Sequence, residues 1–240
     1  MKNLLKAALW RAGYQFMPVK AHEGGKLAHD EFVTYLQNLV GGFLAPGNLE
    51  AMERALNEMP SRGAVVEIGS FLGLSTNILA YTLQQRNCAQ TFFSCDPWTY
   101  EGGLQSLTQT PEFNAWARRT FTENTRLLSA GRLPHTVEAT SDAFFEMWGN
   151  NAVTDDVFGR TVQLGGPIAF CYIDGDHTEA ATRRDFQNVH QNLLPGGFIL
   201  FDDSSNHGYE GVQRVINEVS QNSDYEIAGT FPNVLARRVR

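Results

Sequence analysis

The sequence lacks several features that would assign a protein to a class directly. Its 240 residues include only three cysteines, Cys88, Cys95 and Cys171, and they have no metal-ligand spacing. This odd number argues against a disulfide framework and favours reduced thiols in a cytoplasmic protein. No stretch approaches the ~20 apolar residues that a transmembrane helix needs. The net charge of -7 argues against a general nucleic-acid binder, which would carry a basic face.

The length fits one domain with a modest extension. Residues 1–60 show helical patterns and no strand signal, and residues 1–18 indicate an amphipathic helix rather than a signal peptide. In this region Asn48 is a suitable N-cap for a helix that runs to about Met59. We therefore expect a helical N-terminal extension over residues 1–60 and one larger domain over residues 61–240.

Short apolar runs alternate with helical patterns over the larger domain. The expected strands are Ala64–Ile68, Thr91–Cys95, Thr136–Ala139, Ile168–Ile173, Phe198–Phe201, Tyr225–Thr230 and Asn233–Val239. The expected helices are Ser75–Gln85, Pro111–Leu128, Ala143–Trp148, Glu179–Leu194 and Gly211–Val219, and Ser141 and Asp142 are expected to cap the third of them. Strands that are apolar throughout are typical of a parallel sheet covered on both faces. The sequence predicts an α/β fold with a doubly wound, mostly parallel seven-stranded sheet, whose last two strands form an edge hairpin.

Carboxylates follow the fourth and fifth of these strands. Asp174 and Asp176 come after the fourth, and Asp202 and Asp203 come after the fifth. Ligands of open parallel sheets bind at the carboxyl ends of the strands. We expect these side chains and His177 to lie close together along one edge of the sheet, which we call the acidic rim. A cation or a cationic substrate bound there would offset the repulsion between the carboxylates.

A glycine-containing turn follows the first strand. It runs from Glu67 to Gly73, and a helix begins at Ser75, an arrangement typical of nucleotide-binding elements. Phe71 stands where a dinucleotide-binding motif has its middle glycine, which argues against a dinucleotide. Glu67 suits a ligand with an amino group instead. Asp96, at the end of the second strand, can accept hydrogen bonds from both hydroxyls of a ribose.

In combination, these motifs resemble the class I S-adenosylmethionine-dependent methyltransferases. The run from Glu67 to Ser75 resembles the first motif of the catechol and caffeoyl-CoA O-methyltransferase group. Asp174–His177, Pro195–Gly197 and Asp202–Asp203 resemble the metal motifs of the same group. The resemblance is closer still to the macrolide-sugar O-methyltransferases, and it covers about residues 60–240.

The resemblance implies a role for each matching position. The implied cofactor-binding residues are Glu67, Gly69, Ser70, Phe71, Ser75, Asp96, Ser141, Asp142 and Asp174. Among them, Ser75 would hold the carboxylate of the cofactor, and Ser141 and Asp142 would contact its adenine. Asp174, Asp202 and Asp203 would bind a divalent ion, usually magnesium.

His177 falls on the position of the general base. Catechol-type enzymes carry lysine there, but the lysines of this chain are confined to Lys2, Lys6, Lys20 and Lys26. The sugar enzymes carry histidine, so the resemblance favours a sugar or another natural product as the methyl acceptor.

The chemistry of the residues agrees with that function. A hard cation held by carboxylates would lower the pKa of a bound hydroxyl, and an imidazole can accept its proton near neutral pH. We therefore expect a metal-dependent O-methyltransferase with His177 and Asp174 as catalytic residues and a small-molecule hydroxyl as acceptor. Whether the chain forms a homodimer stays open, as does a direct role for Asp176.

Two other functions stay open at this point. An iron-dependent oxygenase on the same scaffold would need a second histidine, for which His207 is the nearby candidate. A non-catalytic binding module would need neither a metal nor a base. Trp98, Tyr100, the insertion 150–166 and the N-terminal helices are expected to shape the acceptor pocket. Asp185 is expected on a solvated helix face with its neighbouring arginines.

Overall fold

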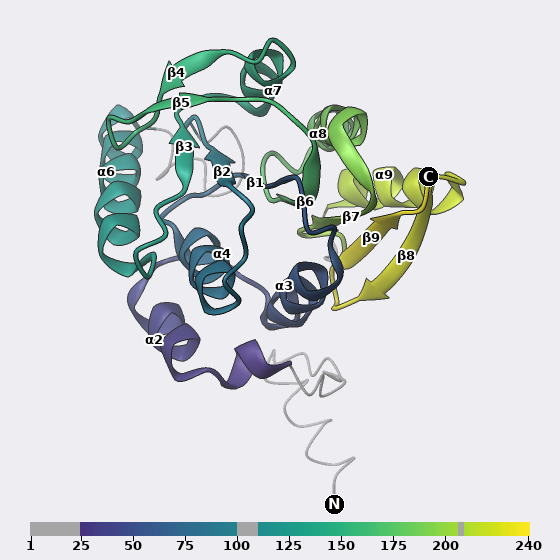
Figure 1. Ribbon diagram of the computed structural model, residues 1–240, viewed down its shortest axis with the longest axis horizontal. Coiled ribbons are helices and arrows are strands. Elements are labelled where there is room, and N and C mark those ends of the chain that lie inside the picture. Colours follow the sequence, from purple (N-terminus) through teal and green to yellow (C-terminus); the bar gives the residue numbers. More distant parts are fainter. Residues whose placement is uncertain (1–24, 100–109, 206–208) are drawn as a thin grey trace, which may run out of the picture.

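The computed structural model describes residues 25–99, 110–205 and 209–240. Its main sheet has seven strands: β1 (Ala64–Ile68), β2 (Phe92–Cys95), β3 (His135–Val137), β6 (Ile168–Ile173), β7 (Leu193–Phe201), β8 (Tyr225–Thr230) and β9 (Val234–Arg238). The described helices are η1 (Lys26–His29, a short 3₁₀ helix), α2 (Glu31–Leu39), α3 (Pro46–Glu58), α4 (Leu74–Gln85), α6 (Pro111–Leu128), α7 (Ser141–Gly149), α8 (Glu179–Asn192) and α9 (Glu210–Gln221). Figure 1 shows the helices arranged around this sheet.

The strand order is β3-β2-β1-β6-β7-β9-β8. The first five strands of that order are parallel, and β9 runs antiparallel to both β7 and β8. This confirms the predicted mostly parallel, doubly wound sheet with an antiparallel edge hairpin. The order reverses between β1 and β6, and such a switch point leaves a crevice at the carboxyl ends of the two strands.

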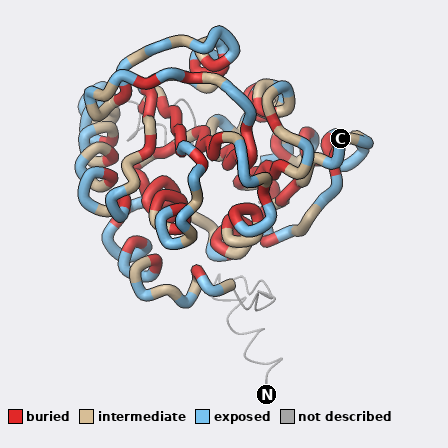
Figure 2. The backbone as a smooth tube through the Cα atoms, viewed as in Figure 1, coloured by how far each residue is buried: buried red, intermediate tan, exposed pale blue. Residues whose placement is uncertain are grey.

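Successive side chains of each strand point to opposite faces of the sheet, so the core has two layers. Val65 faces a cluster that includes side chains of α3 and α4, whereas Val66 faces a cluster that includes side chains of α7, α8 and α9. Both faces of the central strands are therefore buried, as their unbroken apolar runs predict. Figure 2 shows this burial concentrated in the strands and on the inner sides of the helices.

Three local expectations were wrong. Helix α8 ends at Asn192, and Leu193 already pairs with Ile168, so Pro195-Gly196-Gly197 lies within β7 rather than before it. Thr140, not Ser141 or Asp142, is the N-cap of α7. Asn48 is not a cap, because α3 begins at Pro46 and Asn48 is fully buried within it.

The insertion 150–166 contains a small antiparallel hairpin, β4 (Val153–Asp155) and β5 (Thr161–Gln163). After β4 the backbone N–H of Val157 donates to the carbonyl of Thr136 in β3. The insertion therefore packs against the β3 edge of the sheet.

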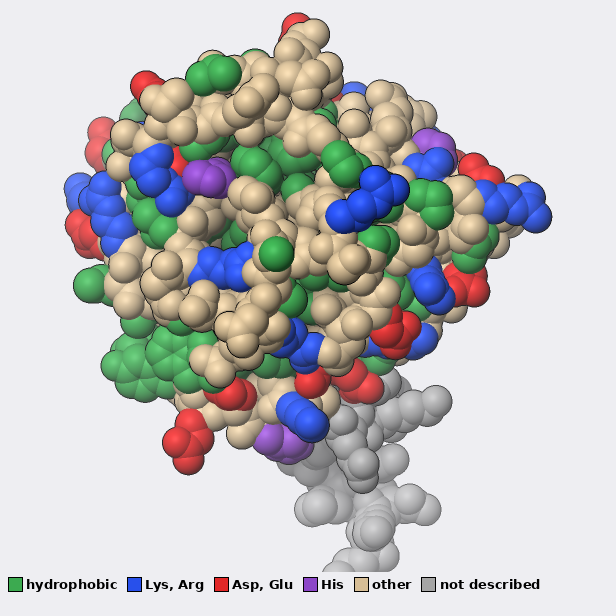
Figure 3. Space-filling view, in the orientation of Figure 1, with side chains coloured by type: hydrophobic (Ala, Val, Ile, Leu, Met, Phe, Trp, Pro, Cys, Tyr) green, Lys and Arg blue, Asp and Glu red, His purple; other side chains and the backbone are tan. Residues whose placement is uncertain are grey.

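All three cysteines are free thiols, and Cys95 and Cys171 are buried. Among the described helices, none is long and apolar enough to cross a membrane. Exposed hydrophobic side chains include Tyr35, Leu39 and Phe43 in and just after α2, where Figure 3 shows a hydrophobic patch. The helix expected in residues 1–18 lies outside the described residues.

Candidate active site

The site is built where the loops after β1 and β6 meet. Gly69 follows β1 with φ +85°, and a Cβ atom there would overlap the carbonyl oxygen of Asp174. The backbone N–H of Asp174 donates to the carbonyl of Ile68 at 2.8 Å. Only a glycine allows this close approach in that conformation. The turn of the predicted nucleotide motif is thereby held directly against the first acidic loop.

Glu67, the last residue but one of β1, is fully buried. Its Oε2 accepts hydrogen bonds from Thr76 Oγ1 at 2.5 Å and Ser70 Oγ at 3.2 Å. Burial raises the pKa of Glu67 to about 7, although hydrogen bonds from Thr76, Ser75 and Ser70 oppose that rise. Its other oxygen, Oε1, is buried without a hydrogen-bond partner. A buried acceptor without a partner is costly, so this atom is suited to receive a donor from a ligand.

Asp96 holds the glycine turn from the side of β2. Its Oδ2 accepts from the backbone N–H groups of Ser70 and Phe71, each at 2.8 Å, and its Oδ1 accepts from Trp98 N at 2.6 Å. Burial raises the pKa of Asp96, and these backbone donors oppose the rise. Phe71 has φ +44°, which is unusual for a bulky residue and is maintained by this pairing. Asp96 therefore has a structural role in the turn, and a carboxylate has room for a further donor at Oδ1.

Trp98, which the sequence predicts at the acceptor pocket, is one of the residues that line a hollow at the carboxyl ends of β2 and β3. It is buried against Leu72, Ala117 and Phe121, and its Nε1 donates to the carbonyl of Phe71 at 2.9 Å. Trp98 thus packs against the glycine turn and stabilises it. Tyr100 and His207, which the sequence also singled out, lie outside the described residues.

The predicted acidic rim forms at the ends of β6 and β7. Asp174 and Asp202 are in side-chain contact, and desolvation, Asp202, Glu67 and Asp203 raise the pKa of Asp174 well above its usual range. His177 Nε2 lies 3.4 Å from Asp203 Oδ2. The ring of Tyr209 lies 4.8 Å from that of His177, centroid to centroid.

The donor chemistry of this rim suits a hard divalent cation, because its acidic side chains offer only carboxylate oxygens. Burial first, and then the nearby carboxylates, disfavour the ionised form of Asp174, and a bound cation would oppose both effects. Within the described part of the chain, though, no three His, Cys, Asp or Glu side chains converge into a metal-binding group. The side chains of Asp174 and Asp202 contact each other, whereas the carboxylate of Asp203 lies beside the imidazole of His177.

Sequence reasoning missed two amides that contact Asp202. Asn48 Nδ2 donates to Asp202 Oδ1 at 2.6 Å, and Asn233 Nδ2 donates to the same oxygen. All three side chains are buried. Asparagine near a helix start or in a hairpin turn is common, so the sequence carries no signal for this contact.

The predicted adenine-contacting residues lie beside α8. Asp142 pairs with Arg184 at 3.0 Å on the surface. Ser141 hydrogen-bonds Asp185, which is only 2% exposed and not on a solvated face as expected. Burial raises the pKa of Asp185 to about 7. Asp176 Oδ1 accepts from the backbone N–H of Thr178 at 2.8 Å, which is a loop-capping role.

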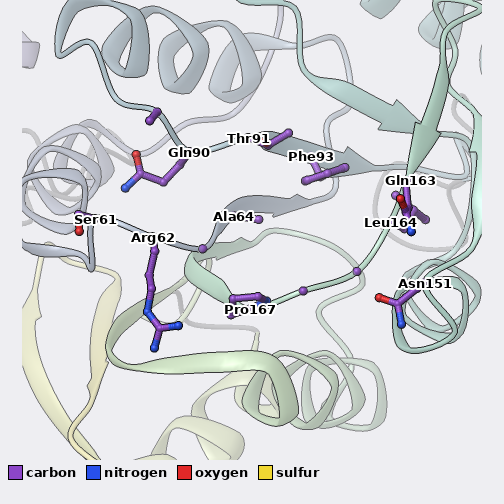
Figure 4. Close-up of a pocket in the computed structure, with 14 residues that line it drawn as sticks. Ser61, Arg62, Ala64, Gln90, Thr91, Phe93, Asn151, Gln163, Leu164 and Pro167 are labelled. Atoms are coloured by element: carbon purple, nitrogen blue, oxygen red, sulfur yellow. The ribbon is translucent and has the colours of Figure 1, made fainter.

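Of two hollows on the surface, one adjoins this site and the other lies apart from it. One opens beside Asp96 and is lined by residues that include Pro97, Thr99 and Glu138, at the carboxyl ends of β2 and β3. The other, in Figure 4, is lined by residues that include Arg62 and Thr91, which precede β1 and β2. Since the strands are parallel, that second hollow lies at the opposite edge of the sheet and outside the candidate site.

Comparisons with known proteins agree with this geometry. Residues 66–204, more than half of the chain, match the sequence model of a family described as a methyltransferase domain. No curated protein sequence matches the chain.

Several solved structures share the fold. The calicheamicin methyltransferase CalS11 is 13% identical with a TM-score of 0.55, over 95% of each chain. An O-methyltransferase from Bacillus cereus in complex with SAH is 13% identical with a TM-score of 0.53, over 100% of each chain. The O-methyltransferase NovP is 15% identical with a TM-score of 0.53, over 82% of this chain and 81% of that one. These likenesses confirm the Rossmann-like methyltransferase fold, and the family match shows that this chain belongs to the methyltransferase-domain family.

Proposed function

We propose that the protein transfers a methyl group from S-adenosylmethionine to a hydroxyl group of a small molecule. The observation that carries this proposal is the unpartnered Oε1 of Glu67 at the switch point of the sheet, next to the acidic loop that bears Asp174 and His177. The crevice offers a buried acceptor for a cationic amino acid, and the loop beside it offers a base.

The cofactor would lie along the glycine turn. Its ammonium group would donate to Glu67 Oε1, and Ser75 at the start of α4 would hold its carboxylate, where a helix N-terminus favours an anion. Its ribose would reach Asp96 and the hollow beside it. Gly69, Ser70 and Phe71 would line the methionine part, and Ser141 and Asp142 the adenine.

The reaction needs a base aligned with the acceptor. The acceptor oxygen forms a bond to the methyl carbon as the carbon–sulfur bond breaks, which leaves S-adenosylhomocysteine and one proton to remove. In this proposal Nε2 of His177, which lies 3.4 Å from Asp203 Oδ2, carries the ring hydrogen, and Nδ1 takes that proton. Asp203 would orient the ring, and Tyr209 would confine it.

A divalent cation, magnesium in our proposal, is part of this function. Asp174, Asp202 and Asp203 would hold it, because a cation would offset the burial and the mutual repulsion that raise the pKa of Asp174. When bound, such an ion would supply Lewis acidity that lowers the pKa of the acceptor hydroxyl.

We further propose a sugar or another natural product as the acceptor. Support comes from histidine rather than lysine at the base position and from the likeness to CalS11, a TDP-rhamnose 3'-O-methyltransferase in calicheamicin biosynthesis. A cytoplasmic location belongs to the same proposal, because both strand cysteines are free thiols.

The test combines cofactor binding with turnover. Wild type, His177→Ala and Asp174→Ala are incubated with S-adenosylmethionine, magnesium and a panel of nucleotide-sugars and glycosylated natural products, and methylated product is measured by mass spectrometry. His177→Ala should lose turnover but keep S-adenosylhomocysteine binding, and Asp174→Ala should lose both turnover and the response to magnesium. Full activity in the presence of a strong chelator would refute the metal. Full activity of His177→Ala would refute the assigned base.

A further inference from the structure

One hollow lies directly beside Asp96, the residue proposed to hold the ribose of the cofactor. Its volume is about 470 Å³, within the roughly 300–1,000 Å³ of known small-molecule sites. Its walls come from the loop after β2, from α6 and from the loop after β3, and they include Pro97, Thr99, Pro111, Asn114, Arg118 and Glu138. In a nucleoside, the base is attached to the carbon next to the one that bears the 2′-hydroxyl. A ribose bound to Asp96 would therefore place its base in this hollow.

The charges in the walls of this hollow balance each other. Among the described residues that line it, the charged side chains are Arg118 and Glu138, and Arg118 Nε lies 2.7 Å from Glu138 Oε2. The Glu138 carboxylate also contributes to the raised pKa of Asp96, so the hollow and the ribose-binding acid are close together. A phosphate would need a cation that is not already paired. A neutral, flat heterocycle therefore suits this hollow better than an anion.

Asn114 brings an unused hydrogen-bond acceptor to the wall of the hollow. Its Oδ1 is buried and has no hydrogen-bond partner in the described part of the chain. Ala117 and Phe121, three and seven positions later on the same face of α6, are fully buried. A polar amide thus continues the apolar face of this helix, where an acceptor without a partner lowers stability. A ligand with an N–H donor would remove that cost.

The start of α6 holds this amide in a defined place. Thr110 caps the helix: its Oγ1 accepts from the backbone N–H of Phe113 at 3.1 Å, and its carbonyl accepts from the backbone N–H of Asn114 at 3.0 Å. One turn further on, Ala117 belongs to the same hydrophobic cluster as Trp98, which follows Asp96 by two positions. The fold therefore sets the position of Asn114 relative to the ribose-binding acid.

We propose that Asn114 is a specificity-determining residue that binds the 6-amino group of the adenine of the cofactor. This inference rests on the proposed function. The amino N–H would donate to Oδ1 of Asn114, and its Nδ2 would donate to a ring nitrogen beside that group, a pairing that asparagine makes with adenine in nucleic acids. Ser141 and Asp142, which would line the adenine from the side of α7, already bond Asp185 and Arg184. Asn114 instead offers an acceptor that has no partner in the described chain.

The test compares S-adenosylhomocysteine with its 6-deamino analogue, in which purine replaces adenine. Both ligands are titrated by calorimetry into wild type, Asn114→Ala and Asn114→Asp. Because one hydrogen bond is at stake, we expect wild type to bind S-adenosylhomocysteine about fivefold to tenfold more tightly than the analogue. Asn114→Ala should bind the two ligands about equally, whereas Asn114→Asp keeps an acceptor oxygen and should keep a preference for S-adenosylhomocysteine.

Asn192→Ala is the matched control for removal of an amide. Its Nδ2 donates to the Asn188 carbonyl at 3.0 Å in α8, away from the hollow, so this variant should keep the wild-type preference. A substitution that only disturbs α6 would weaken the binding of both ligands by the same factor and leave the ratio of the two affinities unchanged. This ratio therefore separates recognition of the amino group from an effect on folding.

Thermal unfolding checks that each variant is folded. Equal binding of the two ligands by wild type overturns the inference, and so does an unchanged preference in Asn114→Ala. If Asn114→Ala does not fold, Asn114→Ser takes its place, because the serine side chain is too short to reach the base. Absence of S-adenosylhomocysteine binding in wild type would refute the cofactor in the proposed function, a result distinct from equal binding of the two ligands.

Discussion

The elevated pKa of Glu67 leads to a prediction that links the candidate site to the free energy of unfolding. Its pKa is about 7 in the folded protein against 4.5 for an ordinary glutamate. Between these two values the folded state holds a proton that the unfolded state has released, so stability falls as pH rises and levels off above about 7. With about 1.36 kcal/mol for each pKa unit, the loss is roughly 3 kcal/mol. Glu67→Gln cannot ionise and should not show this loss.

The assay is urea unfolding of wild type and Glu67→Gln at about pH 5 and about pH 8. We expect Glu67→Gln to gain roughly 2–3 kcal/mol relative to wild type between these two conditions. Glu58→Gln is the control for the substitution itself, since Glu58 is exposed and paired with Arg54 at 3.1 Å. An equal Glu67→Gln difference at both pH values would refute a buried glutamate with an elevated pKa.

Three further predictions concern neighbouring residues. Asp96→Ala leaves three buried backbone N–H groups without their acceptor and should lower the free energy of unfolding by about 3 kcal/mol, measured with urea; wild-type stability would contradict its role in the turn. Gly69→Ala should unfold at a lower temperature and bind S-adenosylhomocysteine more weakly, because its Cβ would overlap the Asp174 carbonyl; unchanged melting and binding would show that the two loops can separate. Asp185→Asn should be more stable than wild type above pH 7 but not at about pH 4, because burial raises the pKa of Asp185 to about 7; a pH-independent difference would refute this.

Much of the fold follows from the sequence because the central strands are apolar throughout and are separated by helical patterns. The position of the acids also follows from the sequence, because Asp174 and Asp202 come directly after two neighbouring parallel strands. His177 was placed beside this rim by its spacing alone, and the structure puts it 3.4 Å from Asp203. These features depend on local pattern and on the rules of parallel sheets.

The features that could not be predicted depend on contacts across the chain. Asn48 suits a helix cap locally, but its partner Asp202 lies 154 positions away. Asp185 follows two arginines, as on many solvated helix faces, yet it turns inward to Ser141. Trp98 follows β2 in a loop, and the sequence gives no sign that its backbone N–H donates to Asp96 and its indole N–H to the carbonyl of Phe71.

The measurement that tests the account most directly is calorimetric titration with S-adenosylhomocysteine at about pH 8, where Glu67 is ionised. We predict saturable binding to wild type and Glu58→Gln, and clearly weaker binding to Glu67→Gln, which cannot offer an anionic partner to the ammonium group. Absence of binding heat for wild type, together with no shift in its thermal unfolding on adding S-adenosylhomocysteine or S-adenosylmethionine, would contradict the proposed cofactor and the reaction built on it.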